Sequence, residues 1–447
     1  MPALLETIAA YGAADSTRAL PAEVTHYAKR AVIDWFSALY PGTRVSPALN
    51  LVRAHAAELG AGRSSLPGFA TTAFPALAAW INGSASHSVE FDDIFKDAVY
   101  HPGCPTIAAA LAVAEDRAAT GAQFLNAVVV GYEISTRIGA AVQPSHYRYF
   151  HTTGTAGSFA GAAAAAALYA PGNVLAMQNA LATAGTFASG LQQAFRSDSM
   201  TKPLHAGHAA SIGVTAAQAA AHGVTGAADL LEGDAGFGAA LSTGARWEVA
   251  TEGLGTRYNI LAITQKNHGC CGHTFAAIDA ALALRTQGVT AAQVAKLEVQ
   301  TYQAALDVAG HLSPRTAAEA KFSLPYVVAH ALLHGSVRLD AFDEERLASM
   351  AIRELMTKVD VKADARLTAA FPGQRAARVR ITLADGRTLE HFAPCRKGDP
   401  EAPLTDAEID DKYLELVSPV LGQARARELL ARLWQVETLA VAGLGLR

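Results

Sequence analysis

The sequence predicts a mainly helical fold in which a smaller α/β region is inserted before the last helices. Alanine-rich segments with helical spacing occupy the chain from residue 1 to about 250. Short runs rich in β-branched residues follow Gly253, and helical spacing returns near the C-terminus. We therefore expect a large all-helical domain at 1–262 and 399–447 and a smaller α/β domain at 263–398.

The first helical region contains an amphipathic segment at residues 22–40. Its apolar residues form one stripe, whereas Lys29, Arg30 and Asp34 lie off that stripe and are expected to face water. A second stretch, residues 159–170, is mostly alanine. It is too short and too weakly apolar to cross a membrane, so we expect it to pack closely against other helices.

The α/β region is predicted from its strands. Runs rich in β-branched residues indicate strands at 258–264, 296–302 and 378–383. The last of these continues through Asp385 and Gly386 into a further run, which is a hairpin pattern. Thr405 and Glu408 then have capping-box spacing ahead of an amphipathic helix, and we expect this tail to rejoin the helical domain.

Composition limits the kinds of partner that the protein can have. Apolar residues make up 51% of the chain and charged residues 17%, with a formal charge of −4, so no extended basic surface is available for nucleic acid. The four cysteines form no CxxC pair, and reduced thiols are expected. The N-terminus lacks the pattern of a signal peptide. We expect a soluble, cytoplasmic protein with a small ligand and no membrane partner.

The segment 87–103 is the first candidate for chemistry. It places two histidines, His87 and His101, among four carboxylates between alanine-rich helices. Pro102 favours an extended conformation at His101 and fits the first turn of a helix, so His101 should lie just outside a helix N-terminus. The segment lacks an HExxH or similar ligand spacing, so no metal site is expected. An acidic turn in water is the alternative.

Two further segments repeat this arrangement. His151 precedes Thr152 and Thr153 at the start of a helix of small residues. Pro203 is predicted to begin another helix, with Lys202 extended just before it and His205 within the first turns.

Three predicted helices therefore begin beside a cationic or imidazole side chain. Helix N-termini carry partial positive charge and unpaired N–H groups, so three of them around one cleft would hold a di- or tricarboxylate without a metal. If they lie apart, each is an ordinary surface cap.

The α/β region contains two more candidate segments. Residues 265–280 bring together Lys266, two adjacent cysteines and His273, but adjacent thiolates seldom fit one zinc site, and packing is the expected role of both cysteines. Residues 321–335 place Ser323 and Tyr326 at the start of an apolar helix. The tyrosine hydroxyl can donate to an oxyanion or cap the edge of the core.

These segments together resemble the MmgE/PrpD family, whose members include 2-methylcitrate dehydratases, cis-aconitate decarboxylases and iminodisuccinate epimerases. The resemblance spans nearly the whole chain. The motifs occur in this order: EFDD at 90–93 with HPG at 101–103, GYEISTRIG at 131–139, FHTTGTAGSFAGAAAAA at 150–166, TKPLHAGHAA at 201–210, KNHGCCGHTFAAIDA at 266–280, FSLPY at 322–326 and KGDPEAPLTDAEIDDKY at 397–413.

The resemblance implies a helical domain built from both chain ends, an inserted α/β lid, a homodimer, and catalysis without a metal or organic cofactor. Combined with the reasoning above, it predicts five catalytic residues: His101, Lys202, His273, Asp93 and Tyr326. The predicted substrate-binding residues are Glu90, Asp92, His151, Thr201, His205, Lys266 and Ser323.

The chain departs from the family pattern at two positions. Relatives often carry a histidine where this sequence has Phe275, and His273 lies two residues earlier. Ile94 occupies a position where a threonine often follows the aspartates.

The chemistry implied is proton transfer at the carbon beside a carboxylate, with His101 and His273 as the acid–base pair and Lys202 stabilising the developing charge. We expect a lyase, a dehydratase or decarboxylase, acting on a small di- or tricarboxylic acid such as 2-methylcitrate or cis-aconitate. An epimerase of a dicarboxylic acid such as iminodisuccinate is the alternative enzyme. A carboxylate-binding protein without turnover is the alternative of another class.

Overall fold

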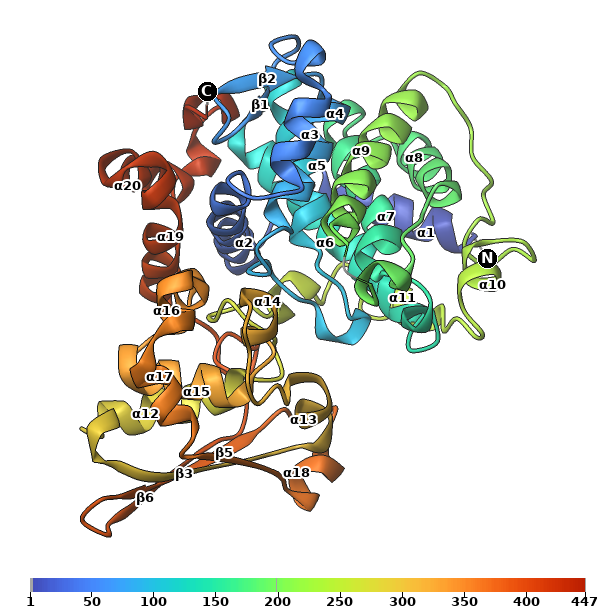
Figure 1. The fold of residues 1–447 in the computed structure, drawn as a ribbon. Coiled ribbons are helices and arrows are strands. Elements are labelled where there is room, and N and C mark those ends of the chain that lie inside the picture. The colour runs from blue at the N-terminus through green and yellow to red at the C-terminus, as the bar shows by residue number, and fades with distance from the viewer. Residues whose placement is uncertain (1–2, 198, 447) are drawn as a thin grey trace. The chain divides into compact units, whose positions relative to one another are not determined.

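The computed structural model describes residues 3–197 and 199–446. Its chain divides into two compact units, Met1–Gln265 with Thr405–Arg447, and Lys266–Leu404 (Figure 1). The predicted fold class, mainly α with a smaller α/β region, is confirmed.

The helical unit contains a small antiparallel hairpin, β1 (Ser64–Leu66) with β2 (Thr71–Ala73), among its helices. The helices are α1 (Leu4–Asp15), α2 (Ala22–Gly42), α3 (Ala48–Ala54), α4 (Pro75–Ser86), α5 (Gly103–Asp116), α6 (Gly121–Ala141), α7 (Thr152–Tyr169), α8 (Val174–Thr186), α9 (Thr201–Ala221), α10 (Phe237–Leu241), α11 (Glu248–Thr251), α19 (Asp406–Leu421) and α20 (Gln423–Leu433).

Small residues allow α7 to lie at the centre of this unit. Every residue from Thr152 to Leu168 is buried, and α7 packs against α5, α6, α8 and α9. A Cβ added at Gly213 of α9 would lie 2.4 Å from the backbone nitrogen of Ala162, so glycine is required at this crossing. The alanine-rich stretch is thus a packing element, as predicted. Within the described residues, no helix has both the length and the apolar content needed to span a bilayer.

The prediction that Arg30 and Asp34 face water is wrong. Both side chains are buried, because the C-terminal helix α19 covers this side of α2. Lys412 of α19 is fully buried, and its Nζ lies 2.6 Å from Oδ1 of Asp34. The same Nζ donates to the carbonyl of Phe91 at 3.0 Å. Asp34 therefore meets a buried partner that is 378 positions away in sequence.

The α/β unit is built on a four-stranded sheet with strand order β4–β3–β5–β6. Its strands are β3 (Val294–Thr301), β4 (Val359–Ala363), β5 (Ala377–Leu383) and β6 (Thr388–Ala393). Its helices are α12 (Phe275–Thr286), α13 (Gln303–Ala309), α14 (Ala317–Ala320), α15 (Leu324–His334), α16 (Glu344–Ala348), α17 (Met350–Met356) and α18 (Ala365–Ala370).

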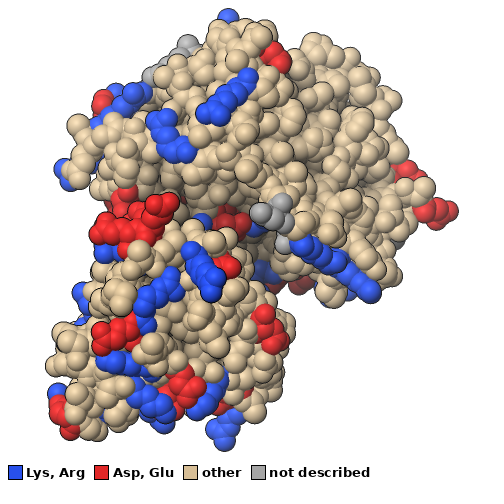
Figure 2. Space-filling view, in the orientation of Figure 1, with Lys and Arg blue, Asp and Glu red and all other residues tan. Residues whose placement is uncertain are grey.

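Alternation along β5 explains why one face of this sheet is covered. Val379 and Ile381 are buried beneath helices such as α12, whereas Arg378 and Arg380 lie on the other face. The predicted hairpin is confirmed, since β5 and β6 pair antiparallel across the Asp-Gly turn. On the face shown in Figure 2, cationic and anionic side chains of this unit intermix rather than forming one basic stripe.

The predicted strand at 258–264 is wrong. The segment instead contains a 3₁₀ helix, Asn259–Ala262. Buried side chains of α6 accept hydrogen bonds from this segment. The Ile260 backbone amide donates to the Glu133 carboxylate at 3.0 Å, and the Asn259 side-chain amide donates to the Thr136 hydroxyl at 3.0 Å. Side-chain partners thus replace the neighbouring strand that a β-rich composition suggested.

Candidate active site

The segment between α4 and α5 carries the densest group of ionisable side chains in the helical unit. Two of its residues adopt left-handed backbone conformations: Glu90 has φ of 61° and Val99 has φ of 48°. Such conformations are unfavourable for residues with a Cβ and especially for a β-branched one. Strain of this kind persists where surrounding contacts fix the backbone, and it is common at functional sites.

Asp92 lies at the centre of this group and is fully buried. Its Oδ2 lies 2.7 Å from Nδ1 of His87 and 2.9 Å from Nδ1 of His101, and it accepts from Sγ of Cys104 at 3.2 Å. Burial opposes ionisation, but the two imidazoles outweigh it and hold the pKa of Asp92 well below its ordinary value. An ionised Asp92 favours the Nδ1–H form of His101, which leaves Nε2 as the basic nitrogen.

A row of imidazoles continues from this carboxylate to helices α7 and α9. The His87 ring lies 4.9 Å from that of His101 and stacks at 5.5 Å on that of His151. Nδ1 of His151 lies 3.1 Å from Nδ1 of His205. Burial and neighbouring imidazoles lower the pKa of His151, and they lower that of His205 to about 4, so both rings are neutral near pH 7.

Lys202 supplies a cation beside these rings. It forms an ion pair with the carboxylate of Glu90. Burial disfavours its charge, but Glu90 more than compensates and raises the pKa of Lys202. The predicted start of this helix is wrong, because α9 begins at Thr201 and places Lys202 within the first turn rather than before it.

The structure brings together the three helix starts that the sequence singled out. His101 lies just before α5, and His151 is the residue preceding α7. The His101 backbone amide donates to Oγ1 of Thr153 in the first turn of α7 at 3.3 Å, and His205 of α9 contacts His151. These contacts argue against three separate surface caps. A cationic side chain and several N–H donors share one region of the helical unit, which suits carboxylate binding.

Asp93 follows Asp92 in the chain and is protonated more readily than Asp92. Its Oδ1 accepts from the Gly103 amide at 3.0 Å and its Oδ2 from the Tyr132 hydroxyl at 2.7 Å. Burial nevertheless raises the pKa of Asp93 to about 7. Adjacent carboxylates therefore have opposite tendencies: Asp92 stays ionised, whereas Asp93 can carry a proton near neutral pH.

The raised pKa of Asp93 predicts how stability depends on pH. A carboxyl group whose pKa is higher in the folded chain than in the unfolded chain binds more protons when folded, so its contribution falls as pH rises from about 4 to about 7. We expect Asp93→Asn to gain stability relative to the wild type, by roughly 1–4 kcal/mol, between about pH 5 and about pH 8. Urea unfolding at both pH values measures this difference.

The matched control for this experiment is Asp97→Asn, which alters an exposed carboxylate of the same segment. Its stability difference from the wild type should be the same at both pH values. An unchanged difference for Asp93→Asn as well would show that Asp93 does not titrate in this range.

One group of donors among the described residues lies close enough together to hold a metal ion. Ligand atoms of His87, Asp92 and Cys104 lie within 4.8 Å of one another. They are already hydrogen-bonded to each other through the Asp92 carboxylate. Burial raises the pKa of the Cys104 thiol well above its ordinary value, which favours a thiol donor over the thiolate that zinc binds.

Thr201 is exposed at the start of α9, and its hydroxyl lies 2.8 Å from that of Ser199. The remaining predicted site residues lie in the α/β unit. Nδ1 of His273 lies 2.8 Å from the Tyr302 hydroxyl, and Lys266 is buried. Tyr326 is fully buried with its hydroxyl donating to the carbonyl of Ala341 at 2.6 Å, so its contacts favour capping of the core. The Ser323 hydroxyl accepts from the Tyr326 amide and donates to a backbone carbonyl, and it therefore caps α15.

Phe275, which stands where relatives often carry a histidine, has a structural role in this chain. Phe275 is the first residue of α12 and is buried in the core of the α/β unit. Cys270 is buried in the same core, in agreement with the packing role expected for it. Nε2 of His268 lies 2.8 Å from Oδ1 of Asp279, and the His268 ring packs edge-on against that of Phe275.

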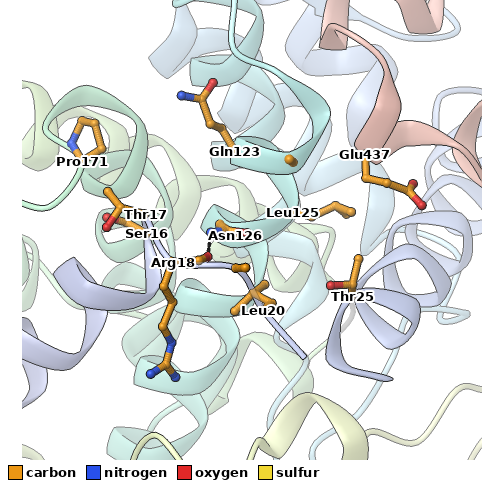
Figure 3. Close-up of a pocket in the computed structure, with 12 residues that line it drawn as sticks. Ser16, Thr17, Arg18, Leu20, Thr25, Gln123, Leu125, Asn126, Pro171 and Glu437 are labelled. Carbon is orange, nitrogen blue, oxygen red and sulfur yellow. Dashed lines mark hydrogen bonds between the residues drawn. The ribbon is translucent and has the colours of Figure 1, made fainter. Parts of the chain in front are cut away.

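A separate pocket of about 500 Å³ lies elsewhere in the helical unit (Figure 3). It is lined by residues such as Thr17, Arg18, Gln123 and Pro171. The Asn126 side chain bridges its wall by donating to the carbonyls of Asp15 and Arg18. None of the predicted site residues lines this pocket, so it is not the candidate active site.

Sequence reasoning missed three members of these clusters. Tyr132 and Cys104 lie in apolar helical segments, where nothing distinguishes them from core residues. The sequence signal that could have identified Tyr132 as a site residue was its position within the GYEISTRIG motif. Arg375 precedes β5, and only the tertiary structure brings its charge near His273.

The fold and the site define a class of protein: a mainly helical chain with an inserted α/β unit and a buried carboxylate–imidazole group beside a lysine. Residues 6–250 match the MmgE/PrpD N-terminal domain and residues 268–436 match the MmgE/PrpD C-terminal domain. The chain belongs to the MmgE/PrpD family.

Three relatives show the range of similarity within that family. Cis-aconitate decarboxylase-like protein oryM of Aspergillus oryzae is 28% identical over 94% of this chain and 92% of its own length. Cis-aconitate decarboxylase of Homo sapiens is 27% identical, covering 82% of this chain and 77% of the relative. Cis-aconitate decarboxylase of Aspergillus terreus is 25% identical, covering 93% and 89%. These relatives support an enzyme of the lyase type.

Proposed function

We propose that the protein is a dehydratase- or decarboxylase-type lyase that acts beside a carboxylate of a small di- or tricarboxylic acid. Family membership and the names of the relatives support this class. Cis-aconitate is the first candidate substrate because the relatives carry its name, and 2-methylcitrate is the second. The homodimer implied by the family resemblance stays a prediction.

The observation that carries the proposal is the Asp92–His101 pair next to Lys202. Asp92 lies 2.9 Å from Nδ1 of His101, which orients the ring and stabilises its protonated form when Nε2 takes a proton. Lys202 lies in the first turn of α9, where its ammonium group and the helix N-terminus both favour a bound carboxylate.

The proposed chemistry follows from these roles. In decarboxylation, the bond between the carboxylate carbon and its neighbour breaks, carbon dioxide leaves, and protonated His101 gives its proton to the carbon that retains the electron pair. In dehydration, His101 removes a proton beside a carboxylate and hydroxide leaves from the next carbon. Lys202 stabilises the negative charge that develops in either case. The partnership of His101 with His273 stays a prediction.

The test is proton NMR of the full-length, EDTA-treated protein in deuterium oxide with a panel of acids: cis-aconitate, 2-methylcitrate, citrate, malate and iminodisuccinate. We expect either a decarboxylated product that carries carbon-bound deuterium from cis-aconitate or a dehydrated product from 2-methylcitrate. The signal should persist after chelation and disappear in His101→Ala and Lys202→Ala. His222→Ala, at the exposed C-terminal end of α9, is the matched control and should keep full activity.

The other outcomes of this panel each contradict part of the proposal. Deuterium exchange of iminodisuccinate without net loss would indicate the epimerase alternative. Binding without exchange of any carbon-bound proton would indicate a carboxylate-binding protein. Activity that survives both substitutions would place the active site elsewhere in the molecule.

A further inference from the structure

The α/β unit contains a second ionisable cluster, arranged around the ring of Phe371. The Tyr302 ring stacks on it with centroids 4.7 Å apart and an interplanar angle of 12°. The guanidinium carbon of Arg375 lies 5.7 Å from its centroid, and the His273 ring lies 6.0 Å away. Three polar side chains from separate segments are thus positioned by one aromatic ring.

Arg375 is the unbalanced charge of this cluster. Within the part of the chain that the structure describes, it forms no ion pair and no hydrogen bond; its guanidinium packs on Phe371, and the Asp399 carboxylate favours its charged form without pairing with it. Its positive neighbour Arg396 is buried and already neutralised by Asp399, which it holds through two hydrogen bonds of 2.6 and 2.8 Å. Burial, followed by repulsion from Arg396, lowers the pKa of Arg375.

A half-buried guanidinium without an anion is costly, and a second guanidinium nearby increases that cost. A packing role for the Arg375 stem does not account for it, because a neutral side chain of similar length would cover the same ring. An anion bound at Arg375 would remove both penalties. The planar fork of guanidinium N–H groups matches a carboxylate in a bidentate arrangement.

His273 adds a second donor to the same place. Its Nδ1 shares a hydrogen bond of 2.8 Å with the Tyr302 hydroxyl, so Nε2 is the ring nitrogen that remains for a ligand. Burial, reinforced by Arg375 and Arg396, lowers the pKa of His273 to about 4, and burial raises that of Tyr302 to about 12. A protonated Tyr302 that donates to Nδ1 leaves the proton of the neutral ring on Nε2, where it can be donated to an anion.

We propose that Arg375 and His273 form a binding site for one carboxylate group of a small organic acid. The choice of a small organic acid as the ligand rests on the proposed lyase function. The role of Arg375 is binding, so its loss should act on the affinity for that acid. In this arrangement His273 serves as a neutral hydrogen-bond donor, which differs from the acid–base role predicted for it.

The experiment titrates tricarballylate, a saturated tricarboxylate, into the full-length protein by isothermal titration calorimetry. Arg375→Gln should weaken binding by about 10–100-fold, the range expected for loss of a hydrogen-bonded charge. Arg375→Lys should recover part of this loss, since it keeps the charge without the planar fork. Arg387→Gln is the matched control: this arginine is exposed in the β5–β6 turn and paired with Asp385, and the substitution should leave affinity unchanged.

Turnover of the substrate found by NMR separates this proposal from the proposed function. Tricarballylate affinity that is unchanged in Arg375→Gln would overturn the site, while turnover by the wild-type protein would leave the lyase function standing. Arg375-dependent binding of tricarballylate by a protein with no turnover would uphold the site while the lyase function fails. Inorganic phosphate binding as tightly as tricarballylate would overturn the assignment to carboxylates.

Discussion

Replacement of His101 by glutamine is expected to lower kcat by about 10²–10⁴-fold, the usual contribution of a positioned general acid or base. Glutamine keeps a hydrogen-bonding group near Asp92 but cannot take up or release a proton. The folded structure should change little, because the His101 side chain is partly exposed whereas Asp92 retains His87 and Cys104 as partners. Steady-state kinetics on the substrate found by NMR, with the melting temperature as a check on folding, gives the measurement.

Asp92→Asn extends this experiment to the residue that positions His101. The amide cannot stabilise an imidazolium, so kcat should fall by about 10²-fold or more, with a smaller effect on KM. The pH–rate profile should also change, because the proton affinity of His101 depends on the carboxylate 2.9 Å away. A kcat within about 3-fold of wild type for His101→Gln would exclude His101 as the acid or base.

Replacement of Lys412 by methionine is expected to lower the free energy of unfolding by about 3–5 kcal/mol, which is the typical cost of removing one partner of a buried ion pair. Lys412 is fully buried, and its loss leaves the Asp34 carboxylate buried and uncompensated. It also removes the donor to the carbonyl of Phe91, the residue before Asp92. Urea unfolding followed by circular dichroism measures the loss.

Two further variants identify the cause of that loss. The double variant Asp34→Leu with Lys412→Met removes both charges and should recover a substantial part of the stability. Lys362→Met, which breaks the exposed pair with Asp360, should leave the free energy of unfolding nearly unchanged. A cost below about 1 kcal/mol for Lys412→Met would mean that the pair is hydrated and does not support the site.

Local pattern was sufficient for most of the fold. Helical spacing, the capping box at Thr405 and the Asp-Gly hairpin turn depend on short-range geometry, and the structure contains each of them. The segment 258–264 was predicted wrongly because its composition favours a strand. In the structure its hydrogen bonds go to side chains of α6: the Ile260 backbone amide donates to Glu133, and the Asn259 side-chain amide donates to Thr136. Contacts across more than 120 residues are not visible in a local window.

The sequence by itself determined the helical class, the inserted α/β region and the presence of His101, His151 and Lys202 near helix starts. Each of these depends on residue spacing and on proline or glycine at known positions. Only the tertiary structure decided which groups share a partner. It joined His87 and His101 to one carboxylate, paired Asp34 with a lysine near the other end of the chain, and left Arg375 without an ion pair among the described residues. Charge interactions depend on distance and burial in space, and neither quantity is encoded in a local stretch of sequence.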